Sequence, residues 1–83
     1  MRLEKVQDAL RRKKTEFEYS EADGCGSLDF YYRGLSYHVW EWNDGDVWGA
    51  ETNVFNVGKS RDVDGDYEEE IAAHILSWPD MLV

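Results

Sequence analysis

Between residues 27 and 54, apolar and polar residues alternate along the chain, and two short turn signals interrupt the alternation. The turn signals are Arg33-Gly34 and Asp44-Gly45, and the runs beside them are rich in Tyr, Phe, Trp and Val. Alternation with a period of two residues, broken by two-residue loops that contain glycine, is typical of antiparallel β-hairpins. The pattern therefore predicts three antiparallel strands in this part of the chain.

The two predicted loops fix the cross-strand partners of the middle strand independently of each other. The first loop places Leu28 opposite Val39, and the second places Val39 opposite Ala50. A shift by one residue would turn every side chain to the other face, so the agreement of the two loops predicts one apolar face and one open face. The residues predicted on the open face are Asp29, Tyr31, Ser36, His38, Trp40, Trp42, Gly49, Glu51 and Asn53.

A helix and a further strand are predicted before this region. Apolar residues recur at helical spacing within residues 2–14, which predicts an amphipathic helix there. Residues 15–20 alternate between aromatic and acidic side chains and predict a first strand, which a loop over residues 23–26 returns to the sheet. The helix residues predicted to be buried are Leu3, Val6 and Leu10.

A second helix is predicted near the end of the sequence, after a loop or fading strand over residues 55–63. Asp64 or Asp66 is predicted to cap the start of this helix, and Pro79 is predicted to end it. Its predicted buried stripe consists of Ile71, Ala72, Ile75, Leu76 and Trp78.

These elements predict an α+β fold with the order α-β-β-β-β-α, in one domain that spans residues 1–83. The four strands form an antiparallel meander. Since both helices carry an apolar stripe and only one face of the sheet is apolar, both helices are predicted to pack on that face.

The charge of the chain is strongly negative and unevenly distributed. The formal net charge is −9, yet residues 1–14 hold six basic and two acidic side chains, against three basic and sixteen acidic ones in the remainder. An acidic surface repels nucleic-acid phosphate and anionic lipid. We therefore expect no direct binding to nucleic acid or membrane, and we expect a basic protein partner to be favoured.

The sequence also bears on the compartment. No apolar run approaches 18 residues, and no apolar signal-peptide core is present. The single cysteine cannot form an internal disulfide, which is consistent with a reducing cytoplasm. We expect a cytoplasmic protein.

Two details of the predicted open face concern chemistry. The predicted register places Trp40 over Gly49, and it places His38 between Asp29 and Glu51. An imidazole between two carboxylates is expected to be easier to protonate. A cross-strand charge pair on a wet surface is the favoured interpretation, and a ligand site or acid–base centre is the alternative.

The element order, helix, strands, then helix, resembles that of double-stranded RNA-binding domains. Those domains hold phosphate with basic residues at the start of their final helix. This chain has Glu68, Glu69 and Glu70 there, so RNA binding by that route is excluded on charge.

Three segments resemble those of a small family of uncharacterised bacterial proteins. They are residues 34–41 (GLSYHVWE), residues 49–53 (GAETN) and residues 65–68 (GDYE). The resemblance covers about residues 23–78 and implies a bacterial, cytoplasmic protein without implying an activity.

Three functions from different classes are compatible with this pattern. The favoured one is a small acidic, non-enzymatic interaction or regulatory module that binds a protein partner through the open aromatic face, where a homodimer could also form. The second is a nucleic-acid mimic that inhibits a DNA- or RNA-handling protein, of the anti-restriction or anti-CRISPR type. The third is a small enzyme or ligand-binding domain centred on Asp29, His38 and Glu51, which a flat face disfavours because it excludes little water.

The binding residues predicted for the favoured function are Asp29, Tyr31, His38, Trp40, Trp42, Glu51 and Asn53. No catalytic residue, cofactor or metal site is predicted.

Overall fold

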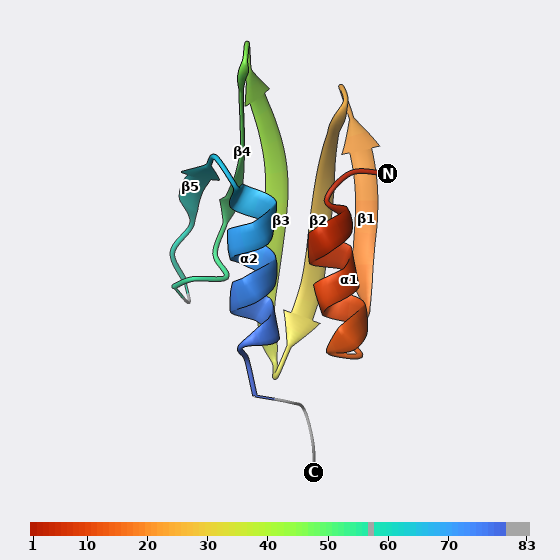
Figure 1. Cartoon of the computed structure of the whole chain (residues 1–83). Coiled ribbons are helices and arrows are strands. Elements are labelled where there is room, and N and C mark those ends of the chain that lie inside the picture. The colour runs from red at the N-terminus through yellow and green to blue at the C-terminus, as the bar shows by residue number, and fades with distance from the viewer. Residues whose placement is uncertain (57, 80–83) are drawn as a thin grey trace.

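The computed structural model describes residues 1–56 and 58–79, and it has two helices and one five-stranded antiparallel sheet (Figure 1). The strands lie in the order β1-β2-β3-β4-β5. The elements along the chain are α1 (Glu4–Arg12), β1 (Phe17–Ala22), β2 (Cys25–Tyr32), β3 (Leu35–Asp44), β4 (Val47–Thr52), β5 (Arg61–Asp64) and α2 (Tyr67–Leu76). The predicted α+β class and the order of the predicted elements are confirmed.

The predicted number of strands, four, is wrong, because a fifth strand begins within residues 55–63, which were predicted as a loop or fading strand. In β5, Val63 pairs with Ala50 and Asp62 pairs with Glu51. Three of the four β5 residues are charged, so the sequence there carries almost no strand pattern. The strand forms because the outer edge of β4 is free to pair and because Val63 is buried, at 8% exposure.

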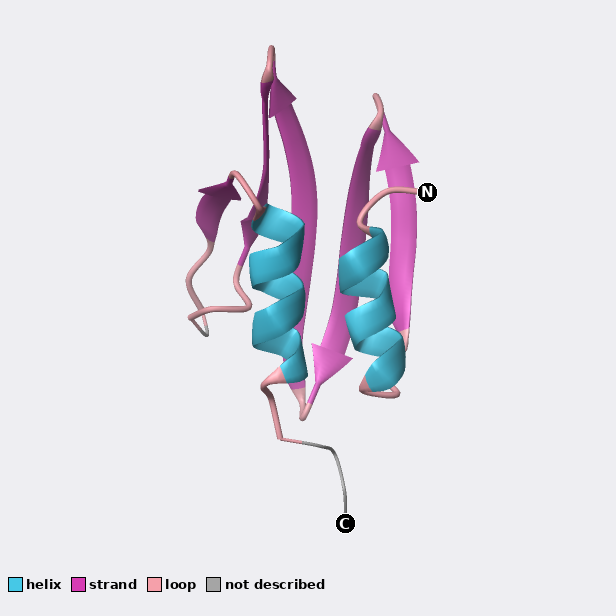
Figure 2. Cartoon of the chain, viewed as in Figure 1, coloured by secondary structure: helices cyan, strands magenta, loops and turns pink. Residues whose placement is uncertain are grey.

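Both helices cover the same face of the sheet, as predicted, and they lie side by side (Figure 2). The core between the layers is apolar, and the predicted helix residues are part of it. Its fully buried members include Leu3, Val6 and Leu10 before and within α1, Ile71 and Ile75 from α2, and Leu28, Val39 and Ala50 from the sheet. Leu76 is 38% exposed, so its predicted burial is wrong, whereas Trp78 packs against the core as predicted.

The predicted pairing of β2 with β3 is confirmed, and that of β3 with β4 is shifted by two residues. Leu28 pairs with Val39, but Val39 pairs with Thr52 instead of Ala50. The loop consists of Gly45 and the residue after it, since Asp44 pairs with Val47. Gly45 has a φ of 64°, and hairpin loops of type II′ require such a conformation at their first position.

The β1–β2 pairing is also shifted by two residues from the pairing that the predicted loop implies, because the observed loop has a different length. A two-residue loop at positions 23 and 24 replaces the predicted four-residue loop, so Tyr19 pairs with Leu28 and Cys25 lies in β2, opposite Ala22. A shift by two residues keeps every side chain on its predicted face. The predicted division into an apolar and an open face therefore holds although the partners differ.

The shift changes which tryptophan covers the strand glycine. Trp42, and not Trp40, lies opposite Gly49. A Cβ atom on this glycine would come within 2.5 Å of the Trp42 ring. The half-buried Trp42 indole therefore fills the space that a side chain at this position would otherwise take.

The sheet opens where β2 and β3 separate at one end (Figure 1). Their pairing runs only from Ser27–Trp40 to Tyr32–Leu35, so beyond it β2 pairs only with β1 and β3 only with β4. Glu41 is the first β3 residue beyond the last pair, and its carboxylate accepts a hydrogen bond from the Gly26 N–H at 2.9 Å. The Glu41 side chain thus accepts the hydrogen bond of a β2 backbone amide at the point where the backbone hydrogen bonds between β2 and β3 end.

Glu41 joins four parts of the chain at this point. Arg2 donates to both carboxylate oxygens, from Nε to Oε1 and from Nη2 to Oε2, each at 3.0 Å. The Tyr67 hydroxyl, at the start of α2, donates to Oε2 at 2.5 Å. The Glu41 side chain is fully buried (0% exposed), and the Arg2 guanidinium also lies over the Trp48 ring at 4.3 Å.

The roles of the two neighbouring tryptophans can be separated by stability measurements. We expect Trp42→Ala to lower the free energy of unfolding by about 2 kcal/mol, because it uncovers Gly49 and removes a half-buried ring. Trp40 is 42% exposed, and we expect Trp40→Ala to cost about 1 kcal/mol or less. Urea denaturation followed by circular dichroism measures both values. A greater loss for the Trp40 variant would contradict the observed register.

Candidate functional site

Two groups of polar side chains are candidates for a functional site: the buried cluster around Glu41 and the open face of the sheet. Burial raises the pKa of Glu41, but the hydrogen bonds from Arg2, Tyr67 and the Gly26 N–H outweigh it and hold the pKa below its ordinary value. Perturbed carboxylates often mark functional sites, although structural ion-pair networks perturb them as well.

The remaining groups of the Glu41 cluster show that its role is structural. The hydrogen bond to Glu41 raises the pKa of Arg2, and burial followed by the hydrogen bond to Glu41 raises the pKa of Tyr67. Among the described residues, no buried side-chain nitrogen or oxygen lacks a hydrogen-bond partner. The carboxylate has its acceptor capacity used by protein donors, so it holds the layers together and is not available to a substrate.

The open face is the side of the sheet away from the helices. Strand alternation places carboxylates there on β1, β2, β3, β4 and β5, and no strand position described on this face is lysine or arginine. The acidic residues at these positions are Glu18, Asp29, Asp44, Glu51, Asp62 and Asp64. Tyr31, His38, Trp40 and Trp42 lie between them, so the face is both acidic and aromatic.

Trp40 and His38 form a stacked pair at the centre of this face. Their ring centroids are 4.1 Å apart with an interplanar angle of 30°. The Trp40 indole Nε1–H donates to Asp29 Oδ1 at 3.3 Å. Asp29 lies opposite His38, as predicted, but its Oδ1 accepts from the Trp40 indole. Glu51 lies opposite Trp40, so the prediction that it lies opposite His38 is wrong.

The arrangement around His38 does not support acid–base catalysis. His38 Nε2 lies 3.6 Å from Glu51 Oε2 and 3.1 Å from Ser60 Oγ. In a catalytic Ser-His-acid triad, one ring nitrogen takes the proton of the hydroxyl, and the other ring nitrogen donates to the carboxylate, which orients the imidazole. Here both groups contact the same nitrogen. The His38 contacts therefore fit a cluster of polar side chains on the sheet surface better than an enzyme centre.

Two of the predicted binding residues are engaged within the fold. Trp42 Nε1–H donates to Asp62 Oδ1 at 3.2 Å while its ring covers the strand glycine. Asn53 follows β4, and its amide bonds to the β3 backbone, accepting from His38 N at 2.9 Å and donating to Ser36 O at 3.0 Å. These two side chains are held by the sheet itself, which leaves Trp40, Tyr31 and the carboxylates as the more available groups.

Tyr31 lies beside a groove at one corner of the open face. The side chain is 73% exposed, the same as that of Met1 and more than that of any other exposed large apolar residue described. The groove has a volume of about 580 Å³. Its lining residues are Lys14, Thr15, Glu16, Phe17, Glu18, Asp29, Phe30, Tyr31 and Ser36.

Ser60, Asp62 and Glu18 contribute to this face but were not predicted as site residues. Ser60 and Asp62 belong to the segment that was predicted as a loop or fading strand, and no face was assigned to them. Glu18 could have been found, because the alternation in the first predicted strand separates it from Phe17 and Tyr19.

Two further findings concern residues 1–56 and 58–79. No three His, Cys, Asp or Glu side chains in this part of the chain lie close enough together to hold a metal ion. No helix in it is long and apolar enough to cross a membrane.

The chain was compared with known proteins. No protein-family model matches it, and no curated protein or solved structure matches it either. The resemblance to a bacterial family described above stays a prediction, and the function is inferred from the geometry.

The structural role of Glu41 can be measured through its pH dependence. The pKa of Glu41 in the folded protein lies below its ordinary value of 4.5, so its ionised form stabilises the fold above that pH, and this stabilisation is lost as the pH falls below it. We expect Glu41→Gln to lower the free energy of unfolding by about 2–3 kcal/mol at pH 7, because it leaves Arg2 without a charged partner. The difference from the wild-type protein should shrink towards pH 3.

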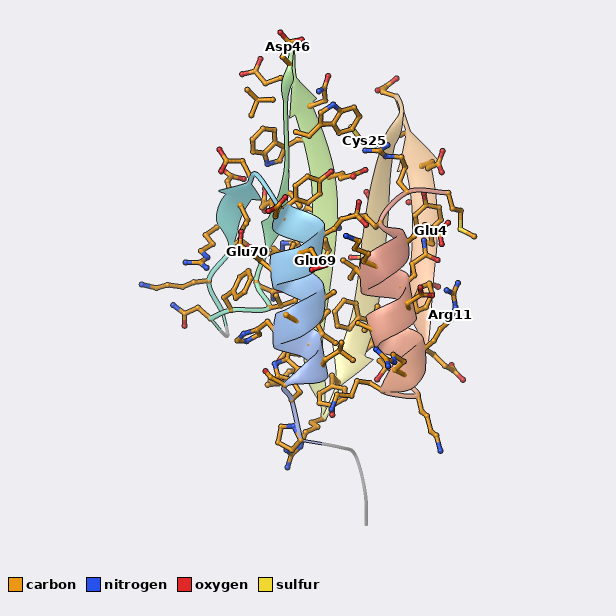
Figure 3. The ribbon with its side chains drawn as sticks, in the orientation of Figure 1. Glu4, Arg11, Cys25, Asp46, Glu69 and Glu70 are labelled. Carbon is orange, nitrogen blue, oxygen red and sulfur yellow. The ribbon has the colours of Figure 1, made fainter. Side chains whose placement is uncertain are left out.

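Urea denaturation at pH 7, 5, 4 and 3 gives this comparison. Glu70→Gln is the matched control, because it makes the same chemical change at an exposed position on α2 (Figure 3). We expect the control to change stability by less than about 0.5 kcal/mol. A difference between Glu41→Gln and wild type that stays constant from pH 7 to pH 3 would contradict the role of the ionised carboxylate.

Proposed function

We propose that the protein is a non-enzymatic interaction module that binds a basic protein partner through the open face of its sheet. The observation that carries the proposal is the exposure of Tyr31 and Trp40, at 73% and 42%. Both residues lie among carboxylates, on a face whose described strand positions include no lysine or arginine. Exposed apolar patches rimmed by polar residues mark interaction surfaces, and tyrosine and tryptophan are enriched among the residues that dominate binding energy.

Trp40 is suited to bind a partner because its ring is already held in place. The stack on His38 and the hydrogen bond to Asp29 restrict the rotation of the indole before any partner arrives. Binding then costs little additional side-chain entropy, which is the usual advantage of a preorganised surface. One side of the ring remains available to solvent and to a partner.

The charge of the face selects the chemistry of the partner. Asp29, Glu51 and Asp62 lie on three different strands, so negative charge extends across the sheet. A positive surface is attracted at long range to such a face, and its lysine and arginine side chains gain cation–π contacts with the aromatic rings. An acidic partner would meet like charge and be repelled.

The same charge argues against a homodimer through this face. A twofold interface places a surface patch against its own copy. The carboxylates of one copy would then lie against those of the other, with no lysine or arginine at the described strand positions of the face to compensate. A partner of opposite charge avoids this repulsion.

A nucleic-acid mimic is a second candidate, and the same acidic residues on the open face favour it. In that case the basic partner is a protein that normally binds DNA or RNA, and the carboxylates occupy its phosphate-binding surface. The two candidates share the face and differ in one property: a mimic competes with nucleic acid for its partner.

The proposed face can be tested with a defined probe. We expect a nine-residue peptide of alternating lysine and serine to shift the NMR signals of Trp40 and Glu51 in the ¹⁵N-labelled protein, because the peptide is cationic and these residues lie on the acidic face. A rise in salt from 50 to 300 mM should weaken binding about fivefold or more, since screening reduces attraction between exposed charges. Trp40→Ala should weaken it about threefold.

The control is the same titration with a peptide of alternating glutamate and serine, which should cause no shifts. Shifts confined to residues on the helix side of the sheet, or equal shifts with the basic and the acidic peptide, would refute binding through the open face. Once a protein partner is identified, displacement of this chain by duplex DNA separates the mimic from an ordinary interaction module.

A further inference from the structure

We infer that the groove beside Tyr31 receives an arginine side chain of the basic partner. The inference rests on the proposed function and specifies where on the open face the partner is anchored and by which side chain.

The groove exists because β2 extends beyond the first residue of β1 at this corner of the sheet. The pairing of β1 with β2 stops at Phe17–Phe30, so Tyr31 has a partner on β3, Ser36, but none on β1. The chain before β1 turns away from the sheet at Lys14, which has a φ of 54°. The corner left open has a volume of about 580 Å³, which lies in the range of small-ligand sites and exceeds the size of one arginine side chain.

The charges around the groove favour a cation. Glu18 and Asp29 lie directly opposite each other on β1 and β2, and like charges in that position destabilise a sheet. Glu16 adds a third carboxylate to the lining, and Lys14 is its single basic residue. Neither Glu18 nor Asp29 forms an ion pair with a basic side chain among the described residues. A cation placed between them would therefore relieve their repulsion.

The shape of the Tyr31 side chain favours arginine over lysine. The guanidinium is planar, so it can stack on an exposed aromatic ring while its N–H groups donate to carboxylates at the side. The lysine ammonium is a compact, strongly hydrated charge that cannot stack in this way. Asp29 Oδ1 accepts from Trp40, and its other carboxylate oxygen accepts no hydrogen bond from a described residue.

The test uses a basic peptide in which one residue is varied. The peptide has a central arginine with two lysines on either side, separated by serines, and its counterpart carries citrulline in place of the arginine. Citrulline keeps the size and planarity of arginine without the charge. We expect the citrulline peptide to bind about five- to tenfold more weakly by fluorescence anisotropy, and we expect only the arginine peptide to shift the NMR signals of Glu18 and Tyr31.

Three variants locate the binding site. Tyr31→Ala and Glu18→Gln should each weaken the arginine peptide about threefold and should reduce the difference between the two peptides, whereas Tyr31→Phe should retain it. Asp46→Asn is the matched control, because it removes one carboxylate at the tip of the β3–β4 hairpin, away from the groove (Figure 3). It should change both peptides equally and by less than twofold.

The outcomes separate this inference from the proposed function. If both peptides bind equally and shift the signals of Trp40 and Glu51 alone, the open face binds basic partners and the arginine groove is refuted. If neither peptide shifts any signal of the open face, both proposals fail. Loss of the arginine preference in the Tyr31→Ala variant, with the preference intact in Asp46→Asn, supports the inference.

Discussion

The structure depends on one ion pair, which the buried Glu41 carboxylate forms with the partly exposed Arg2. The sheet separates into two hairpins at this end, and a buried carboxylate there would be costly without partners. Its partners come from the segment before α1, from β2 and from the start of α2, so a single side chain joins both helices to the separated strands. Gly26 is needed at the contact, because a Cβ there would lie 2.9 Å from the Arg2 side chain.

This arrangement determines which surface is left for function. The helices, the apolar core and the Arg2–Glu41 ion pair all lie on one face, where the described buried side-chain nitrogens and oxygens all have hydrogen-bond partners. The other face keeps an exposed tyrosine, a half-exposed tryptophan and carboxylates on every strand. Such a face offers contact area and charge but little enclosure, which suits the binding of a protein surface better than catalysis.

Much of the fold could be predicted from the sequence, because side chains alternate between the two faces of a strand. A register error of two residues therefore leaves every side chain on its predicted face. The β2–β3 register was predicted correctly, and the β1–β2 and β3–β4 registers were displaced by two residues. The β1–β2 loop ends two residues earlier than predicted, and the β3–β4 loop lies one residue later. Leu28, Val39 and Trp40 nevertheless lie on the predicted faces. The fifth strand was predicted only as a loop or fading strand, because charged residues dominate its pattern and its pairing with β4 depends on the folded sheet. Glu41 was also missed: a glutamate at an inward position is recognised only when its partner Arg2, distant in the sequence, is known to reach it.

The proposed interaction requires that Tyr31 and Trp40 are uncovered in the isolated protein and therefore free to meet a partner. Paramagnetic relaxation by a soluble, uncharged gadolinium chelate measures this in the NMR spectrum. We expect strong relaxation of the Tyr31 ring and Trp40 indole signals, weaker relaxation of the Trp42 indole, and almost none at the methyl groups of Leu28 and Ile71. Tyr31 and Trp40 signals as protected as those methyl groups would show that the open face is already covered and would contradict the proposed interaction.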